Sequence, residues 1–372
     1  MRHRRRLLPV CLLLASLGVA QTTVPARNVV VYKEPGRYGG WPANHGIWSW
    51  GNEILVGFEV GYFLKNDRGH SIDRSKPAEH VLARSLDGGE TWAIERPAGL
   101  RPPPGLQQAD VPTEPGRPVT DCPGNIDFTA PGFALTARMA DIHIGPSRFY
   151  YSTDKGRSWN GPFRLPDFGH PGIAARTDYL INGKHNLTLL LTAAKTNKRE
   201  GRVICVRTRD GGSTWTQEGL VGPEPQGDDY AIMPSSVRLS ATEVLTAVRH
   251  RSFIDSYRST DNGRTWSFVN KPAPDTGRGN PPALIQLKDG RLAITYGHRA
   301  EPYGIRARLS NDKGATWGEE LILRKDAGAW DVGYPRTVQR PDGRIVTIYY
   351  YNDAQDQDRY IAATIWDPGT AR

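Results

Sequence analysis

The sequence has little cysteine, no metal-ligand spacing and no nucleotide-binding motif. Three cysteines occur in 372 residues, and Cys11 falls within an N-terminal apolar run, which leaves Cys122 and Cys205. Two cysteines do not make a disulfide framework, and neither lies in a CxxC or Cys/His pattern typical of zinc. We therefore expect no metal and no cofactor, and the sequence leaves open whether the two cysteines pair.

Long apolar segments are also missing after the first twenty residues, so we expect no membrane span. Residues 1–20 combine four arginines with the apolar run 7–19 and the small residues 18–20. This pattern predicts a secretory signal peptide, with a short membrane anchor as the alternative. Residues 21–372 contain no linker and are expected to form one domain, secreted or periplasmic.

The positive charge is modest once this leader is set aside. The net charge is +9, and the four leader arginines account for part of it, which leaves +5 on the rest. So small an excess is weak support for a nucleic-acid partner and fits an anionic substrate better. The sequence does not determine an oligomeric state.

A repeat with the pattern S/T-x-D-x-G-x-T/S-W dominates what is present. It occurs five times, at intervals of 51 to 67 residues, at 85–92, 152–159, 208–215, 259–266 and 310–317. The Asp can accept hydrogen bonds from its own turn, the Gly supplies a positive φ, and the Trp opens the next strand. Each copy therefore predicts a hairpin turn.

The segments around the repeats predict short strands. Near the fifth copy these are 282–287, 291–296, 304–309 and 318–323, and four strands in about fifty residues are typical of one propeller blade. A sixth set without the repeat follows at 336–339, 344–350 and 360–366, and the N-terminal strand 28–32 would close it. The prediction is an all-β, six-bladed β-propeller.

On these five Asp boxes the chain resembles the sialidase-like (neuraminidase) superfamily with BNR repeats, over nearly its whole length after residue 20. The resemblance implies an exo-acting glycoside hydrolase with a carbohydrate or glycoconjugate substrate. It also implies that the boxes are structural and lie at the outer edge.

In a four-stranded blade, the loop into the first strand and the loop between the second and third share one face, where we looked for a pocket. Tyr334 lies in Asp331-Val-Gly-Tyr334-Pro335, ahead of a strand, a DG turn and an aromatic strand end. Sialidases have a Tyr in this layout, so the resemblance implies Tyr334 as the covalent nucleophile, with Asp331 near the substrate. A packing or stacking role is the alternative.

Sialidases also bind the substrate carboxylate with three arginines. The resemblance assigns two of these to Arg249 and Arg299, with Arg306 close to the second. The third departs from the pattern, because Gly40 stands where an Arg is expected and only Arg37 is nearby.

The acid and base are less well defined. The long loop 61–77 offers Asp67 and Asp73 as the general acid. Sialidases place a Glu beside the Tyr, but Met233 stands at that position, and only Asp228, Asp229 or Glu301 could replace it. Cleavage of sialic acid itself is therefore in doubt.

Histidines are frequent in the same loops, at positions 45, 70, 143, 170, 250 and 298. Of these, His45 and His298 are the candidates for substrate binding, and the segment 37–48 adds aromatic groups suited to a sugar. A Tyr/His pair permits a second function, β-elimination on an acidic polysaccharide or hydrolysis of another acidic or deoxy sugar. A third possible function is that of a non-catalytic propeller that binds glycan or protein.

Overall fold

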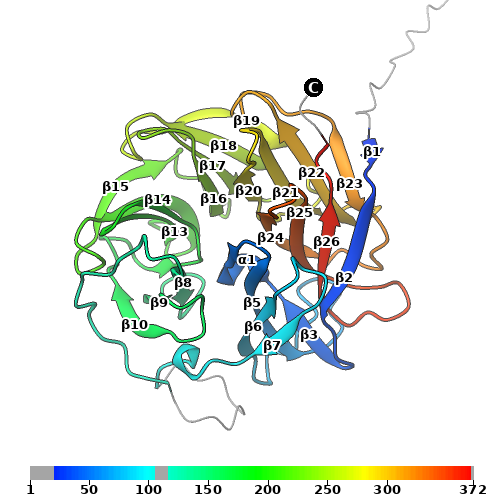
Figure 1. Ribbon diagram of the computed structural model, residues 1–372, viewed down its shortest axis with the longest axis horizontal. Coiled ribbons are helices and arrows are strands. Elements are labelled where there is room, and N and C mark those ends of the chain that lie inside the picture. Colours follow the sequence, from blue (N-terminus) through cyan, green and yellow to red (C-terminus); the bar gives the residue numbers. More distant parts are fainter. Residues whose placement is uncertain (1–20, 105–115, 370–372) are drawn as a thin grey trace, which may run out of the picture.

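The computed structural model describes residues 21–104 and 116–369, and the expected signal peptide lies outside them. Figure 1 shows six sheets arranged as blades around a central axis, with the short helix α1 (Pro42–His45) near the centre. A 3-10 turn, η1 (Ala98–Leu100), is the other helical element in this part of the chain. The predicted six-bladed β-propeller is confirmed. In the ranges described, no helix has the length and apolar character needed to cross a membrane.

The strands of each blade run from the axis outward in chain order. Blade 1 contains β3 (Arg37–Gly40), β4 (Ile47–Trp50), β5 (Glu53–Tyr62), β6 (Glu79–Ser85) and β7 (Ala93–Glu95). Blade 2 contains β8 (Ala134–Met139), β9 (Ser147–Ser152) and β10 (Asn160–Leu165). Blade 3 contains β11 (Ile173–Ala174), β12 (Tyr179–Gly183), β13 (Asn186–Ala194), β14 (Glu200–Thr208) and β15 (Thr216–Val221). Blade 2 thus has three strands rather than the four expected, because the chain ahead of β8 forms turns.

Each of the other three blades is built around four strands. In blades 4 and 5 these strands follow one another in the chain, whereas the outermost strand of blade 6 comes from the N-terminal segment. Blade 4 contains β16 (Ile232–Arg238), β17 (Val244–Arg249), β18 (Ile254–Ser259) and β19 (Ser267–Ala273). Blade 5 contains β20 (Ala283–Gln286), β21 (Leu292–His298), β22 (Gly304–Ser310) and β23 (Glu320–Arg324). Blade 6 contains β24 (Gly333–Gln339), β25 (Ile345–Tyr351), β26 (Tyr360–Trp366) and β2 (Ala26–Tyr32).

The N-terminal segment closes the ring, as the sequence predicts. Strand β2 pairs antiparallel with β26, and β1 (Gln21–Thr23) pairs parallel with β23 of the neighbouring blade. The middle strands of blade 6 are buried along their whole length, since blades cover both of their faces. This burial explains why β25 is a continuous apolar and aromatic run.

The Asp boxes form the hairpins between the third and fourth strands of blades 1, 3, 4 and 5, and the equivalent hairpin between β9 and β10 in blade 2. In the first copy, Asp87 Oδ1 accepts the backbone N–H of Thr91 at 2.9 Å and the Ser85 hydroxyl at 2.8 Å. The Trp92 indole donates to the carbonyl of Gly89 at 3.0 Å. Successive turns of an antiparallel sheet lie at opposite ends, so the boxes lie on the face away from the loops that join second to third strands.

The glycine of each box also packs against the preceding blade. A Cβ on Gly263 would lie 2.4 Å from the Cys205 sulfur, and one on Gly212 would lie 3.2 Å from the Cys122 sulfur. Both thiols are free and buried. The repeat is therefore a joint between blades as well as a turn, and the two cysteines occupy separate joints.

We predict that Gly263→Ala destabilises the protein more than Gly290→Ala does. The two glycines have nearly equal φ angles, +92° and +89°, but a Cβ on Gly290 would meet no atom within 4 Å. Gly290→Ala then measures backbone strain alone, about 1–2 kcal/mol, whereas Gly263→Ala adds overpacking of about 1–3 kcal/mol. Urea denaturation measures the free energy of unfolding of both variants. Equal losses of stability would contradict the close packing of Gly263 against the preceding blade.

Candidate active site

Side chains from four blades meet on the face opposite the Asp boxes. His70 comes from the loop between β5 and β6, and Arg249 ends β17. Arg299 follows β21, while Asp331 and Tyr334 come from the segment that leads into β24. These are the two loop types that antiparallel blades place on one face.

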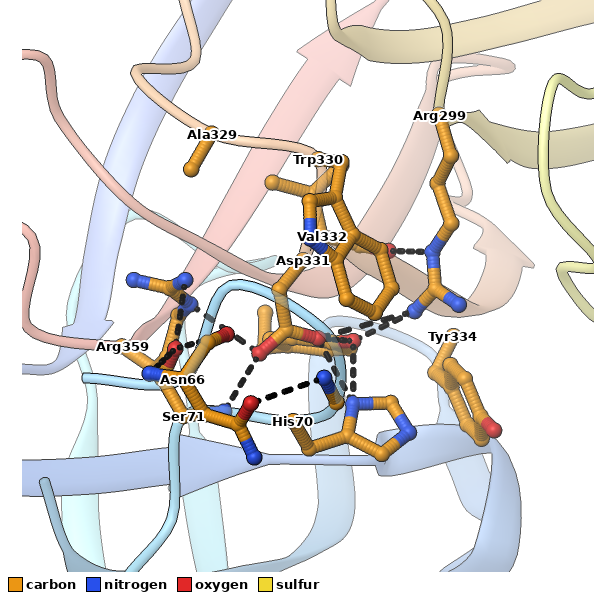
Figure 2. Close-up of polar contacts among 12 residues, drawn as sticks. Asn66, His70, Ser71, Arg299, Ala329, Trp330, Asp331, Val332, Tyr334 and Arg359 are labelled. Atoms are coloured by element: carbon orange, nitrogen blue, oxygen red, sulfur yellow. Dashed lines mark hydrogen bonds and ion pairs between the residues drawn. The ribbon is translucent and has the colours of Figure 1, made fainter. Parts of the chain in front are cut away.

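Asp331 is the centre of the cluster and has no exposed surface. Its Oδ1 accepts a hydrogen bond from His70 Nδ1 at 2.6 Å (Figure 2). The same oxygen accepts the Tyr350 hydroxyl at 2.6 Å. Its Oδ2 accepts the backbone N–H of Ser71 at 3.1 Å and Arg359 Nε at 3.2 Å.

The charge of this carboxyl is set by two opposing effects. Burial by itself raises the pKa of Asp331, but His70, Arg299 and Arg359 together hold that pKa below its ordinary range. Asp331 is therefore an ionised, fully bonded carboxylate that can only accept hydrogen bonds.

The bond to Asp331 fixes the form of His70. Because the carboxylate accepts, Nδ1 carries the proton and Nε2 keeps its lone pair. Figure 2 shows this second nitrogen on the side of Tyr334, whose ring centre lies 5.9 Å from that of His70. Burial is the main cause that lowers the pKa of His70 from 6.5, opposed by Asp331 and aided by Arg299 and Arg249. His70 is thus neutral at pH 7, and its side chain is 23% exposed.

Tyr334 is held in a left-handed conformation, with φ 52°. Its backbone N–H donates to Asn280 at 3.1 Å, and its hydroxyl accepts a hydrogen bond from Arg249 Nη1 at 2.7 Å. Non-glycine residues with such φ values are strained and are often found at functional sites. The surroundings thus fix both the ring and the hydroxyl.

Met233 occupies the equivalent place in blade 4. Its φ is 53°, close to that of Tyr334, and its sulfur lies 3.3 Å from Arg249 Nη1. A thioether therefore stands beside Arg249 where sialidases place a carboxylate. No carboxylate of residues 21–104 or 116–369 forms an ion pair with Arg249.

Arg299 lies on the other side of Tyr334. The guanidinium carbons of Arg249 and Arg299 are each 5.3 Å from the centre of the Tyr334 ring. Arg299 donates to the carbonyls of Val332 and Gly279 at 2.9 and 3.0 Å, and to the Tyr350 hydroxyl at 2.5 Å. The structure thus brings together four of the residues identified in the sequence, Tyr334, Arg249, Arg299 and Asp331. Arg299 is the more firmly tethered arginine, and Asp331, expected near the substrate, is fully buried and bonded to the protein instead.

The other two candidate arginines lie elsewhere. Arg306 is fully buried and donates to the carbonyls of Arg324 and Pro302. Arg37 stacks on the Tyr62 ring at 4.2 Å and has Glu79 at 3.9 Å. Both bind other parts of the chain rather than Tyr334.

The candidate acids and bases are engaged locally. Asp73 accepts a hydrogen bond from the Ser75 hydroxyl at 2.6 Å. Asp67 is exposed, and its backbone carbonyl accepts a hydrogen bond from the Trp330 indole at 3.2 Å. Glu301 is also exposed and accepts the Tyr303 hydroxyl at 3.3 Å.

Asp229 pairs with Arg251 at 2.7 Å. The nearby Asp228 lies 3.4 Å from Arg199. None of these contacts joins an acidic side chain to Tyr334.

The two candidate histidines are also separate from Tyr334. His45 is buried in α1 beside His80, with ring centres 4.7 Å apart. His298 ends β21, and its Nδ1 is buried without a hydrogen-bond partner.

Several residues of the cluster are not evident from the sequence. His70 is only one of six histidines there, although it lies between Asp67 and Asp73. Tyr350 lies near the end of an aromatic strand, which is only a weak sequence indication of a site. No sequence pattern indicates Arg359, because it reaches Asp331 from the loop between β25 and β26.

The comparisons with known proteins agree with this fold. A family model described as a BNR repeat-like domain matches residues 136–347. The chain is similar to a protein of unknown function from Dyadobacter fermentans, with 21% identity, TM-score 0.67, and 91% of this chain and 97% of that one covered. It is similar to a sialidase from Trypanosoma rangeli with 12% identity and TM-score 0.58, where 92% of this chain and 60% of that one are covered. It is also similar to an α-L-arabinofuranosidase from Fusarium graminearum with 14% identity and TM-score 0.55, where 89% of this chain and 97% of that one are covered. No curated protein matches the sequence. At these identities the solved structures show a shared fold.

We predict that Asp331→Asn strongly destabilises the protein. The change leaves Arg299 and Arg359, each with a side chain 3% exposed, without their shared counter-charge. Breaking a buried ion pair in this way costs about 3–5 kcal/mol. Chemical denaturation of the variant checks this, with Asp73→Asn from the neighbouring loop as the control expected to resemble wild type. Equal stability of Asp331→Asn and wild type would contradict the assignment.

Proposed function

The chain belongs to the BNR repeat-like family, and we propose that it is a secreted glycoside hydrolase of sialidase type that removes a terminal acidic sugar from glycoconjugates. The observation that carries the proposal is the placement of Tyr334. Its hydroxyl is bound by Arg249 at 2.7 Å, and its ring lies beside a His70 that is oriented by the buried Asp331. A nucleophile, a base and a group that orients the base are the parts of a catalytic triad.

The acidity of the sugar follows from the arginines. Arg249 contacts phenols and a thioether and forms no ion pair with a described carboxylate, the nearest acting charge being the more distant Glu200. A substrate carboxylate would supply that partner through charge-assisted hydrogen bonds. A neutral phenol also suits attack beside such a carboxylate, because an anionic nucleophile would be repelled.

His70 accounts for the proton transfers. As the Tyr334 oxygen attacks the anomeric carbon, Nε2 of His70 takes the phenol proton, and a water molecule on the opposite face of the sugar protonates the leaving glycosidic oxygen. The hydroxide left by that water then attacks the anomeric carbon and releases the sugar, while His70 returns its proton to the Tyr334 oxygen. Asp331 stays ionised and stabilises the imidazolium that forms between these steps. With His70 in this role, neither Asp67, Asp73 nor a carboxylate at position 233 is needed.

A second function is favoured by the same histidine. A neutral His70 and a phenol next to an arginine could abstract a proton beside a uronate carboxylate and so eliminate the glycosidic oxygen. Hydrolysis releases a saturated sugar, whereas elimination leaves a C=C bond that absorbs ultraviolet light.

We predict that Tyr334→Phe lowers kcat/KM by about a thousandfold or more, since the nucleophilic oxygen is removed. The assay uses fluorogenic α-sialosides and glycosides of other acidic sugars, with ultraviolet detection on acidic polysaccharides in parallel. Tyr151→Phe, a half-buried tyrosine of blade 2, is the matched control and should keep full activity. Cleavage that survives in Tyr334→Phe would contradict the proposal. A folded wild type that binds but cleaves nothing would indicate a glycan-binding propeller.

The pH profile tests His70. Because its pKa lies below 6.5 and the neutral form is the base, kcat/KM should rise as pH increases through that pKa and stay level near neutrality. In His70→Ala, kcat/KM should fall about 10²–10⁴-fold, and its decrease at acidic pH should disappear. Asp67→Asn and Asp73→Asn should keep both the wild-type kcat/KM and the wild-type pH profile. If one of these Asp variants is the inactive one, the acid is a carboxylate as the sequence predicts.

A further inference from the structure

A cavity of about 620 Å³ opens on the face that carries the Tyr334 cluster, between blades 1 and 2. Arg74 and Ala78 reach it from the loop between β5 and β6, and residues 139–142 reach it from the loop between β8 and β9. His45 of α1 forms part of its wall. Its size is within the range of about 300–1,000 Å³ usual for ligand pockets.

Two arginines that line this cavity are buried and form no ion pair in the described part of the chain, although Glu59 acts on Arg138 from a greater distance. Arg138 and Arg148 are each 5% exposed, and within the described ranges neither makes an ion pair with a carboxylate. Nη2 of Arg138 has no hydrogen-bond partner, and burial lowers the pKa of Arg138 to about 9. Buried charges in proteins are normally paired, so an unpaired guanidinium at a cavity wall indicates an anionic ligand.

A metal ion is the competing occupant. Ligand atoms of His45, Glu59 and His80 lie within 4.8 Å of one another in this wall. However, Arg138 acts electrostatically on both histidines and would repel a divalent cation. The lining holds three arginines, Arg74, Arg138 and Arg148, against two carboxylates, Glu59 and Asp141. This excess of positive charge favours an anion, to which the two imidazoles could donate hydrogen bonds.

The cavity is connected to the Tyr334 cluster through Trp41. The indole of Trp41 lies 5.1 Å from the His70 ring, and the Arg74 guanidinium lies 5.6 Å from the Trp41 ring. We propose that the cavity binds the carboxylate or sulfate of the sugar next to the one that is cleaved, so the substrate carries anionic groups on adjacent sugars. The link to a cleaved sugar rests on the function proposed above, whereas anion binding rests on the cavity alone.

The main variant is Arg138→Met, which keeps an unbranched, flexible side chain and removes its charge. The carbonyl of His45, which Arg138 contacts, still accepts the hydroxyls of Thr136 and Thr177 at 2.8 and 2.6 Å. Since an uncompensated buried charge is removed, the ligand-free Tm should be equal to or above that of wild type. A merely structural Arg138 would instead give a lower Tm.

Binding is measured by calorimetry and by the shift in Tm, using glucuronate and sulfate as separate probes. Glucose and sodium chloride of matched ionic strength are the controls. We expect either anion to bind wild type, with affinity reduced at least about tenfold in Arg138→Met. Arg74→Gln, at an exposed position that carries no folding risk, should weaken binding several-fold. Arg249→Met should keep the Arg138-dependent binding.

Three results would overturn the proposal: no anion binding, binding unchanged in Arg138→Met, or binding lost only in Arg249→Met. Tight binding of Zn²⁺ or Ca²⁺ that is lost in His80→Ala would assign the cavity to a metal instead. Cleavage assays separate the two proposals. If glycosides are cleaved and KM is unchanged in Arg138→Met, only the cavity proposal fails, and if nothing is cleaved but Arg138-dependent anion binding persists, only the enzymatic function fails.

Discussion

The buried carboxylate of Asp331 holds together segments that are far apart in the chain. It binds His70 and Ser71 from blade 1, Tyr350 and Arg359 from blade 6, and lies near Arg299 of blade 5. Such an ion is costly to bury, and only this number of donors makes it stable. The same contacts that satisfy the charge also orient the imidazole that faces Tyr334, so stability and site geometry depend on one group.

The cluster differs from the sialidase arrangement in where its proton-transfer group lies. A carboxylate beside the tyrosine is replaced by Met233, and a histidine in the blade 1 loop lies beside the Tyr334 ring. A thioether is too weak a base to take the phenol proton, so the proposed chemistry relies on His70. The fold is shared with hydrolases of different sugars, so the fold alone does not define a substrate.

Buried arginines without an ion pair lie at the two places where we propose that ligands bind. Arg249 beside Tyr334, and Arg138 and Arg148 in the cavity between blades 1 and 2, form no ion pair with a carboxylate of the described residues. The box glycines, in contrast, lie at tightly packed joints between blades. Packed joints on one face and arginines without ion pairs on the other agree with the proposal of a preformed anion-binding site.

The sequence by itself determined the architecture. The Asp boxes, their spacing, the alternating strands and the closing strand are local patterns, and hairpin chemistry acts over a few residues. The resemblance also identified Tyr334, Arg249 and Arg299, which occupy fixed places at strand ends. Only the tertiary structure decided that His70, rather than Asp67 or Asp73, faces Tyr334, and that Arg37 and Arg306 bind elsewhere. The physical reason is that His70 and Asp331 are 261 residues apart, and the path of a long loop depends on partners that no local pattern reveals.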